Sequence, residues 1–247
     1  MTDTHVKIWD DGPVRIIAFD REAKGHAITK KMAEDVQRAM EEFDASDQRV
    51  AVFTATGTRA FTFGADVTAP PELWRAVPTV GFRTLKPVIC AVEGWCVGGG
   101  IVLAMMSDLL ICGASAKFYY PEAKIGLTGG MIAGLVSRIP HKIAMEFFLM
   151  CRTVDAARAE RVGLANEVVP DGEAIDRAIA WGKEMAGMAP LVLHELKRAV
   201  VDDILPRGPS EQMALHGARM ADIRNSADVR EGVLAFQEKR PPRFEGG

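Results

Sequence analysis

The sequence predicts an α/β fold in which a core of mixed strands and helices precedes a helical C-terminal region. Three observations indicate this class. Two strand-like runs flank a turn near the N-terminus, an apolar run passes through glycines into an apolar helix, and strand patterns stop beyond Ala174. We therefore expect two regions, a core over residues 1–188 that holds the functional site and a helical region over residues 189–247.

The N-terminal elements follow from turn chemistry and periodicity. Val6–Trp9 and Val14–Phe19 flank Gly12-Pro13, which predicts a hairpin. Thr29 is the expected N-cap of a helix whose apolar residues recur at helical spacing, namely Met32, Val36, Met40 and Phe43. A short buried strand is expected over Val50–Thr54.

A glycine-rich turn at the centre of the chain is its most informative segment. Val88–Val92 predicts a buried strand, and Gly98-Gly99-Gly100 leads into Ile101–Met106, a predicted buried helix. Glycines at this position expose the first N–H groups of the helix, which carry the positive end of its dipole. Such a helix start can hold an anion, or a negative charge that develops during a reaction.

The remaining elements are short strands and then helices. Phe118–Tyr120 predicts a strand that ends at Pro121-Glu122, and a turn leads into a second strand before Pro170. Helical patterns cover Ala144–Met150, Asp155–Val162, Ile175–Met188, Leu191–Val201 and Ser210–Phe236.

Composition and charge narrow the class of protein. A net charge of -3 without a basic stripe argues against nucleic-acid binding, and no apolar run is long enough to cross a bilayer. Residues 1–5 lack the basic and apolar regions of a signal peptide, so we expect a cytoplasmic protein. Neither the cysteines nor the histidines have metal-ligand spacing, and no metal is predicted at Cys90, Cys96, Cys112, Cys151, His141, His194 or His216.

Four separated blocks resemble the crotonase family, also called the enoyl-CoA hydratase/isomerase family. They are Phe61–Asp66, Lys86–Asp108, Pro121–Gly126 and Arg230–Phe244. The resemblance implies a spiral of ββα turns with a helical C-terminal region that builds homotrimers, often paired into hexamers. It also implies an acyl-CoA thioester substrate, in which coenzyme A is part of the substrate and no other cofactor is needed.

The resemblance also implies roles for individual residues. The backbone N–H groups of Phe63 and Gly99 would form an oxyanion hole for the thioester carbonyl, and Glu122 would be the acid/base. We expect the Phe63 ring to narrow the acyl pocket. The expected substrate-binding residues are Lys24, His26, Gly64, Ala65, Asp66, Gly98, Gly130, Lys239 and Phe244. For Asp66 a turn-closing role is the stronger interpretation. Lys239 and Phe244 are expected either to contact coenzyme A on a neighbouring subunit or to belong to a solvated tail.

Val102 is the main departure from the family pattern. Family hydratases carry a second glutamate there, whereas this side chain is aliphatic. Moving a double bond needs one carboxylate, and adding water is most readily explained by two. Isomerisation is therefore our first hypothesis, with a one-glutamate hydratase or dehydratase and a non-catalytic acyl-CoA binding protein as alternatives.

A dinucleotide-binding oxidoreductase is a further alternative for a strand, glycines and a helix. The G-x-G-x-x-G spacing fails because Leu103 follows Gly98 and Gly100 where glycine or alanine belongs. The sequence therefore argues against this class.

Overall fold

The computed structural model describes residues 5–246. These residues form two sheets, and from β3 to β8 successive strands alternate between them. Residues 1–4, part of the segment used for the signal-peptide prediction, lie outside the described residues. One sheet has six strands in the order β1-β2-β3-β5-β7-β10, and the other has four in the order β4-β6-β8-β9. The strands of the six-stranded sheet are β1 (Val6–Asp11), β2 (Val14–Phe19), β3 (Val50–Ala55), β5 (Val88–Val92), β7 (Leu109–Gly113) and β10 (Glu167–Val169).

The second sheet produces the predicted ββα spiral. It contains β4 (Ala60–Thr62), β6 (Trp95–Val97), β8 (Lys117–Tyr119) and β9 (Val154–Asp155). The pairs β3-β4, β5-β6 and β7-β8 each place one strand in each sheet. They are followed by the 3₁₀ helix η2 (Leu73–Ala76), by α2 (Gly99–Met106) and by α3 (Glu122–Ile125). The α/β class is confirmed, and three ββα turns account for most of the core.

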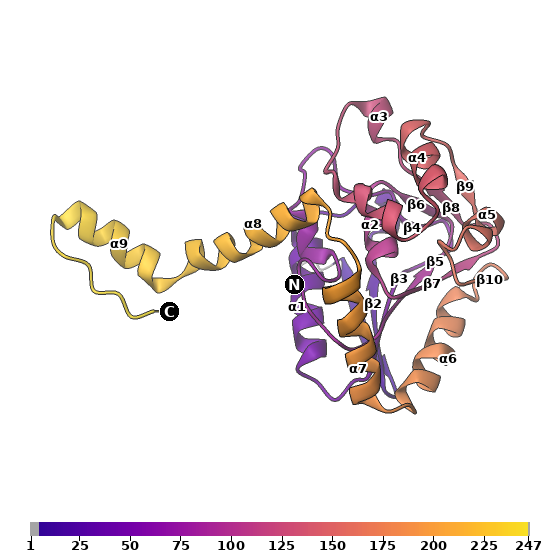
Figure 1. Cartoon of the computed structure of the whole chain (residues 1–247), viewed down its shortest axis with the longest axis horizontal. Helices are drawn as coiled ribbons and strands as arrows, with labels where there is room; N and C mark the ends of the chain where they lie inside the picture. The colour runs from indigo at the N-terminus through magenta and orange to yellow at the C-terminus, as the bar shows by residue number, and fades with distance from the viewer. Residues whose placement is uncertain (1–4, 247) are drawn as a thin grey trace.

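The six-stranded sheet is covered on both faces because its strands are apolar on both. Ile16, Val52 and Ile89 face α6 (Ala174–Ala186), while the alternate residues belong to the larger core on the other face, with α1 (Lys30–Asp44). Figure 1 shows α1 and α6 on opposite sides of the strands. The predicted N-cap is confirmed, since the Thr29 hydroxyl accepts a hydrogen bond from the Met32 N–H.

The predicted buried helix is also confirmed. All eight residues of α2 are buried, which agrees with a helix that is apolar on every side. Asp108, just beyond it, accepts hydrogen bonds from the Val88 N–H and from Lys197, both at 2.7 Å. Asp108 therefore connects the end of α2 to β5 and α7.

Several short elements carry no sequence signal of their own. The strands β6 and β9 and the helix α3 were not predicted, because two to four residues are too few to show a period. Other helices lie close to their predicted positions: α4 (His141–Leu149), α5 (Ala156–Arg161) and α7 (Pro190–Arg198), which continues into the π-helical turn η4 (Ala199–Ile204). The predicted region boundary at residues 188 and 189 falls between α6 and α7.

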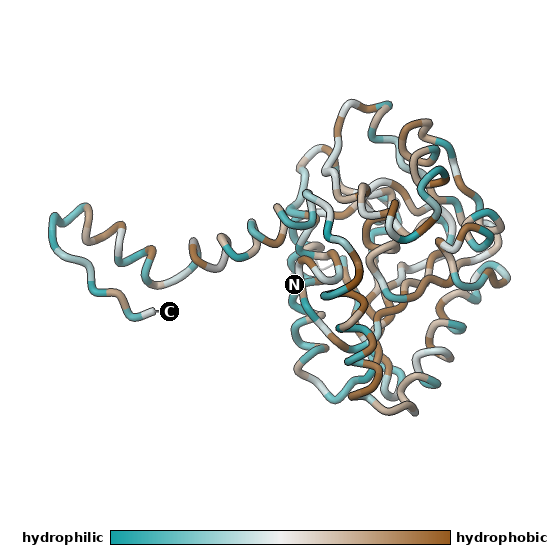
Figure 2. Tube along the Cα trace, in the orientation of Figure 1, coloured by the Kyte–Doolittle hydropathy of each residue, from teal (hydrophilic) through white to brown (hydrophobic). Residues whose placement is uncertain are grey.

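The last helical segment is two helices instead of one. α8 (Pro209–Asn225) ends at Ser226, whose hydroxyl accepts a hydrogen bond from the Val229 N–H and begins α9 (Ala227–Glu238). In Figure 1 these helices form an arm, drawn in yellow, that extends away from the sheets. Figure 2 shows apolar residues spread along this arm. Exposed ones include Met213, Val233, Leu234 and Phe236. Among the described residues, no helix has the length and apolarity needed to cross a membrane.

The base of the arm is anchored by a buried carboxylate. Glu211, in the first turn of α8, is 4% exposed and lies 3.9 Å from the Arg138 guanidinium. Arg138 follows the 3₁₀ helix η3 (Met131–Ser137). Burial raises the pKa of Glu211, and the charge of Arg138 only partly opposes this shift.

This raised pKa predicts a pH-dependent cost in folding stability. Above the ordinary glutamate pKa the unfolded chain has released the proton that the folded chain retains, so rising pH favours unfolding. We expect the free energy of unfolding of the wild type, minus that of Glu211→Gln, to fall as the pH rises above the ordinary glutamate pKa of about 4. Urea unfolding at several pH values measures it, with exposed Glu195→Gln as the control. A difference that rises with pH would contradict the assignment.

Candidate active site

Three of the predicted site segments lie at one edge of the four-stranded sheet. β4, β6 and β8 are adjacent and parallel, with Thr62 opposite Cys96 and Val97 opposite Tyr119. Parallel strands end at the same edge, which is where open α/β sheets place their sites. Phe63–Asp66, Gly98–Gly100 and Glu122 each follow one of these strands, so the topology brings them together.

The start of α2 presents backbone N–H groups at this edge. Gly98 has φ +54° and ψ -118°, and its own N–H donates to the Tyr119 carbonyl at 2.9 Å. Gly99 is the first residue of the helix, a position whose N–H has no acceptor within an α-helix. The Leu73 side chain packs against Gly99, since a Cβ built on Gly99 would lie 2.5 Å from Leu73 Cδ2.

The two loops predicted to form the oxyanion hole contact each other through backbone at Gly64. This residue has φ +90°, and a Cβ built on it would stand 2.8 Å from the Val97 carbonyl oxygen and 3.2 Å from the Gly99 nitrogen. Only glycine fits this close approach without displacing backbone. The loop after β4 therefore lies directly against the start of α2.

The Phe63 N–H points to an acceptor inside the protein. It donates to the Gly25 carbonyl at 2.8 Å, so this predicted oxyanion donor is already occupied. The ring of Phe63 lies over Gly25, where a Cβ would come within 2.4 Å of it, and Arg59 sits 5.7 Å from the ring centroid. A thioester oxygen would have to replace or share the Gly25 carbonyl to use this donor, and the ring faces the N-terminal segment.

The N-terminal segment predicted to contact coenzyme A runs beside the same loop. The Ile28 N–H donates to the Gly64 carbonyl at 2.8 Å, and the Asp66 N–H donates to the Ile28 carbonyl at 2.9 Å. Ile28 pairs with Ala65 as an isolated parallel bridge. Lys24 is exposed at the end of a short 3₁₀ helix in this segment.

The structure places His26, a predicted substrate-binding residue, in the protein interior. Its side chain is 1% exposed, Nδ1 accepts a hydrogen bond from the Arg21 N–H, and Nε2 lies 3.1 Å from the Thr56 carbonyl oxygen. The two partners fix a neutral ring with its proton on Nε2, and burial lowers its pKa. A buried ring with both nitrogens engaged joins two loops and is unavailable to bind substrate.

The turn-closing role favoured for Asp66 fits its contacts. Its carboxylate accepts hydrogen bonds from the Thr68 N–H and hydroxyl and pairs with Arg21 at 3.1 Å. Hydrogen bonds from Thr68, followed by that from Arg21, lower its pKa. An Asp66 held in this way keeps the N-terminal segment against the loop after β4.

Glu122 has the features of an available acid/base. It is the first residue of α3, and its Oε2 is buried without a hydrogen-bond partner among the described residues. An unpartnered carboxylate oxygen away from water is costly to keep, so such groups call for an explanation. Val102 is 4% exposed within the apolar core, and no carboxylate occupies its position.

The other predicted binding residues lie farther from these groups or on the arm. Gly130, with φ +75°, begins η3 and packs against Ser210, where a Cβ would lie 2.3 Å from the hydroxyl oxygen. Lys239 ends α9, and Phe244 lies against Gly232 of the same helix. Figure 1 shows this part of the arm far from the sheets, so Lys239 and Phe244 do not reach the site of their own chain.

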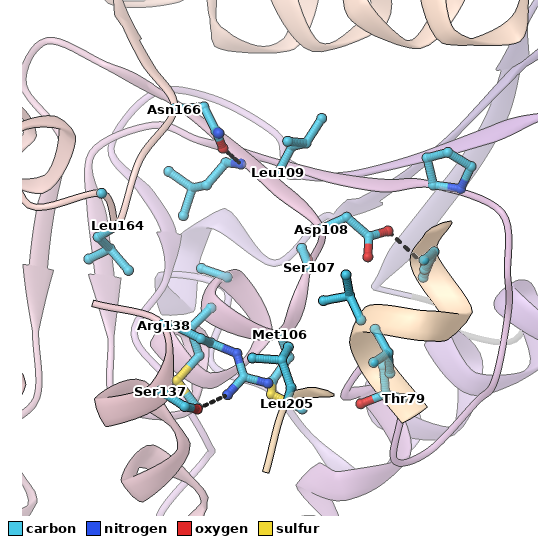
Figure 3. A pocket seen from close by; sticks show the side chains of 18 of the residues that line it. Thr79, Met106, Ser107, Asp108, Leu109, Ser137, Arg138, Leu164, Asn166 and Leu205 are labelled. Carbon is cyan, nitrogen blue, oxygen red and sulfur yellow. Dashed lines mark hydrogen bonds and ion pairs between the residues drawn. The ribbon is translucent and has the colours of Figure 1, made fainter. Parts of the chain in front are cut away.

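A cavity of about 540 Å³ lies at the other end of α2, away from Gly99. Figure 3 shows Met106, Asp108, Arg138 and Leu205 around it. It is lined by apolar side chains and by the Asp108–Lys197 and Arg138–Glu211 pairs. Phe63, Gly99 and Glu122 are not part of its lining, so this cavity is separate from the predicted site.

Sequence reasoning missed Tyr120 and Thr128. Tyr120 is 4% exposed and its hydroxyl oxygen lies 3.3 Å from Thr128 Oγ1. Burial, followed by the influence of the Glu122 carboxylate, raises the pKa of Tyr120 well above its ordinary value. The available signal was position alone, since Tyr120 stands two residues before Glu122.

Thiol and metal chemistry find little support in the described part of the chain. Cys96 is fully buried, and burial raises its pKa well above the ordinary value, which opposes formation of a thiolate nucleophile. No cluster of three or more potential metal ligands occurs among the described residues.

Gly64→Ala tests the backbone contact between the two loops. The added methyl group meets backbone atoms of Val97 and Gly99, so we expect kcat/KM to fall by about 100-fold as the loops separate. Gly172→Ala is the matched control, because Gly172 has φ +89° but no atom within 4 Å of its Cβ position. Equal losses of activity in the two variants would assign the effect to backbone strain.

A family model described as enoyl-CoA hydratase/isomerase matches residues 11–247. A carnitinyl-CoA dehydratase of Proteus mirabilis is 33% identical over 257 residues, covering 95% of this chain and 96% of that protein.

Solved structures give the same result. A carnitinyl-CoA hydratase from Mycobacterium avium superposes with a TM-score of 0.78 at 33% identity, covering 100% of both chains. An enoyl-CoA hydratase from Mycobacterium tuberculosis superposes with a TM-score of 0.76 at 30% identity, covering 98% of this chain and 99% of the other. The chain therefore belongs to the crotonase family, the enoyl-CoA hydratase/isomerase family, and is an enzyme of that family.

Proposed function

We propose that this enzyme acts on an acyl-CoA thioester through an enolate, with Glu122 as its acid/base. The observation that carries the proposal is a buried, unpartnered carboxylate oxygen on Glu122, at the sheet edge where α2 begins. Removing the proton next to a thioester leaves negative charge on the carbonyl oxygen. A preorganised N–H donor stabilises such a charge by roughly 3 to 4 kcal/mol.

Gly99 is the primary donor in this proposal. Its N–H opens α2, so the helix dipole also favours negative charge there. Phe63 is the second donor, and it becomes available when the thioester oxygen takes the place of the Gly25 carbonyl. Lys24 lies beside this loop, exposed, where it can meet the phosphates of coenzyme A.

Isomerisation of a double bond is the reaction we place first. The Glu122 carboxylate takes a proton from C2 of a 3-enoyl thioester. The electron pair of the broken C2–H bond forms a C1=C2 double bond, and the carbonyl π electrons move onto the carbonyl oxygen. The protonated Glu122 then returns the proton to C4, which yields the 2-enoyl thioester. One carboxylate is sufficient, and Val102 offers no second one.

Hydration or dehydration is the second candidate. The relatives carry the printed names carnitinyl-CoA dehydratase, carnitinyl-CoA hydratase and enoyl-CoA hydratase, and this observation favours water chemistry. A hydratase with this site would activate water through Glu122 alone. Matched 2-enoyl-CoA and 3-enoyl-CoA substrates separate the candidates, because water addition and bond migration give different products.

We also propose that the protein works as a homotrimer or a pair of trimers. The arm of α8 and α9 exposes apolar side chains, of which Phe236 is 86% exposed, and these need a partner surface. A second subunit would cover them and would bring Lys239 and Phe244 to a neighbouring site. Light scattering should give a mass of three or six chains, and a monomer would contradict the proposal.

Glu122→Gln tests the assigned acid/base. The amide keeps the shape of the side chain but takes up no proton, so we expect kcat to fall by about 100- to 10,000-fold. Binding of the acyl-CoA, measured by calorimetry, should persist. Glu34→Gln, at a partly exposed position on α1, is the control. Full activity in Glu122→Gln would remove Glu122 from the mechanism, and intact binding without turnover in the wild type would indicate a binding protein.

A further inference from the structure

We propose that the cavity at the far end of α2 binds an apolar carboxylate of the fatty-acid type, whose head group is held by the Arg138 guanidinium. This cavity is separate from the proposed acyl-CoA site, since Phe63, Gly99 and Glu122 do not line it. The proposal therefore adds a second ligand site, and it does not depend on the role of Glu122.

The size and walls of the cavity suit a hydrocarbon chain. Its volume of about 540 Å³ lies within the range of about 300 to 1,000 Å³ that is typical of small-molecule sites. The last turn of α2, Ala104–Met106, forms one wall, and η4 with the turn after it forms another through Val201 and Leu205. Leu110 and Leu164 add further apolar surface. Such walls favour a ligand whose body is apolar.

The charged residues of the cavity are mostly paired. Among the described residues, five charged side chains line it, namely Asp108, Arg138, Lys197, Arg207 and Glu211. Lys197 and Asp108 neutralise each other at 2.7 Å. Arg207 pairs at 2.7 Å with Asp202, which lies outside the lining. The sign of charge that the cavity accepts is therefore set by Arg138 and Glu211.

The charge of Arg138 is incompletely neutralised. Its Nη1 lies 3.9 Å from Glu211 Oε1, which is beyond hydrogen-bond distance, and this oxygen is buried without a hydrogen-bond partner among the described residues. Burial raises the pKa of Glu211, so its carboxyl group carries less negative charge at a given pH than an exposed glutamate. A largely buried cation beside such a group favours the binding of an anion.

One edge of the Arg138 guanidinium is free to hold that anion. Nη1 donates to the Gly134 carbonyl at 2.8 Å and to Ser137 Oγ at 3.3 Å, whereas Nε and Nη2 have no hydrogen-bond partner among the described residues. The side chain is 18% exposed, and Figure 3 shows it beside Met106 and Leu205 at the cavity. The Nε–Nη2 edge of a guanidinium matches the two oxygens of a carboxylate and donates two parallel hydrogen bonds to it.

A carboxylate at the end of a hydrocarbon chain satisfies both features of the cavity. A neutral hydrocarbon would leave the Arg138 charge without an anion, and a small inorganic anion would leave the apolar walls in water. A segment of another subunit is the competing occupant, and it would exclude the acid.

Titration calorimetry with decanoate and decanol tests the choice of ligand on the wild-type enzyme. Decanoate should bind at one site per chain and about 10-fold or more tightly than decanol, which lacks the anionic head group. From octanoate to decanoate the dissociation constant should fall about 4-fold for each added methylene group. An absence of saturable decanoate binding would overturn the proposal and would indicate that protein covers the cavity.

Arg138→Met tests the position of the head group. Methionine keeps an apolar side chain but removes the guanidinium, so decanoate should bind about 10- to 100-fold more weakly while decanol affinity changes less than about 2-fold. Arg152→Met is the control, because Arg152 is 60% exposed, pairs with Glu146 and does not line the cavity. Wild-type decanoate affinity in Arg138→Met would refute the assigned head-group site.

A variant that removes no charge covers the case in which Arg138→Met does not fold. Leu205→Trp fills part of the cavity and should weaken decanoate binding about 10-fold. Leu191→Trp is the matched control, since Leu191 is 80% exposed and lies outside the lining. Equal decanoate affinities in these two variants would contradict the proposal.

Glu122→Gln separates this site from the acyl-CoA site. Decanoate should bind this variant as tightly as the wild type, because Glu122 does not line the cavity. Loss of decanoate binding in Glu122→Gln would place the acid in the acyl-CoA site and overturn the proposal. The turnover of the same variant bears only on the proposed function, so the two failures are distinguishable.

Discussion

The site depends on a contact between two backbone segments that belong to different turns of the spiral. Gly64 brings the loop after β4 against the Val97 carbonyl and the Gly99 nitrogen, at a distance that no other residue allows. This contact is possible because β4 and β6 are adjacent and parallel, so both loops leave the sheet at the same edge. The proposed stabilisation of negative charge at the start of α2 depends on this backbone contact between Gly64 and Gly99.

The rest of the core holds that contact in place. α2 is buried on every side, so its first N–H groups cannot move independently of the sheets. The N-terminal segment is joined to the loop after β4 through Ile28 and the Arg21–Asp66 pair, and the buried ring of His26 joins it to Thr56 in the loop after β3. A polar site is thus built from backbone on a rigid apolar base, which suits preorganised stabilisation of charge.

The chemistry of the site is concentrated on few side chains. With Val102 aliphatic, Glu122 is the one carboxylate that family resemblance, topology and burial together favour. Relatives named for water addition or removal share about a third of their residues with this chain, and that identity establishes the family but leaves the reaction to experiment. The arm of α8 and α9 carries Lys239 and Phe244 away from the sheets, as Figure 1 shows.

The sequence by itself determined most of the longer elements, the buried helix after the triple glycine and the family, because apolar periodicity, caps and glycine runs are local features. It also proposed Glu122, Gly99 and the loop that contains Gly64 as parts of the site. Only the tertiary structure decided that the Phe63 N–H donates to Gly25, that His26 is buried with both nitrogens engaged, and that Tyr120 is buried beside Thr128. Hydrogen-bond partners and burial depend on segments far apart in the chain, which no local pattern records.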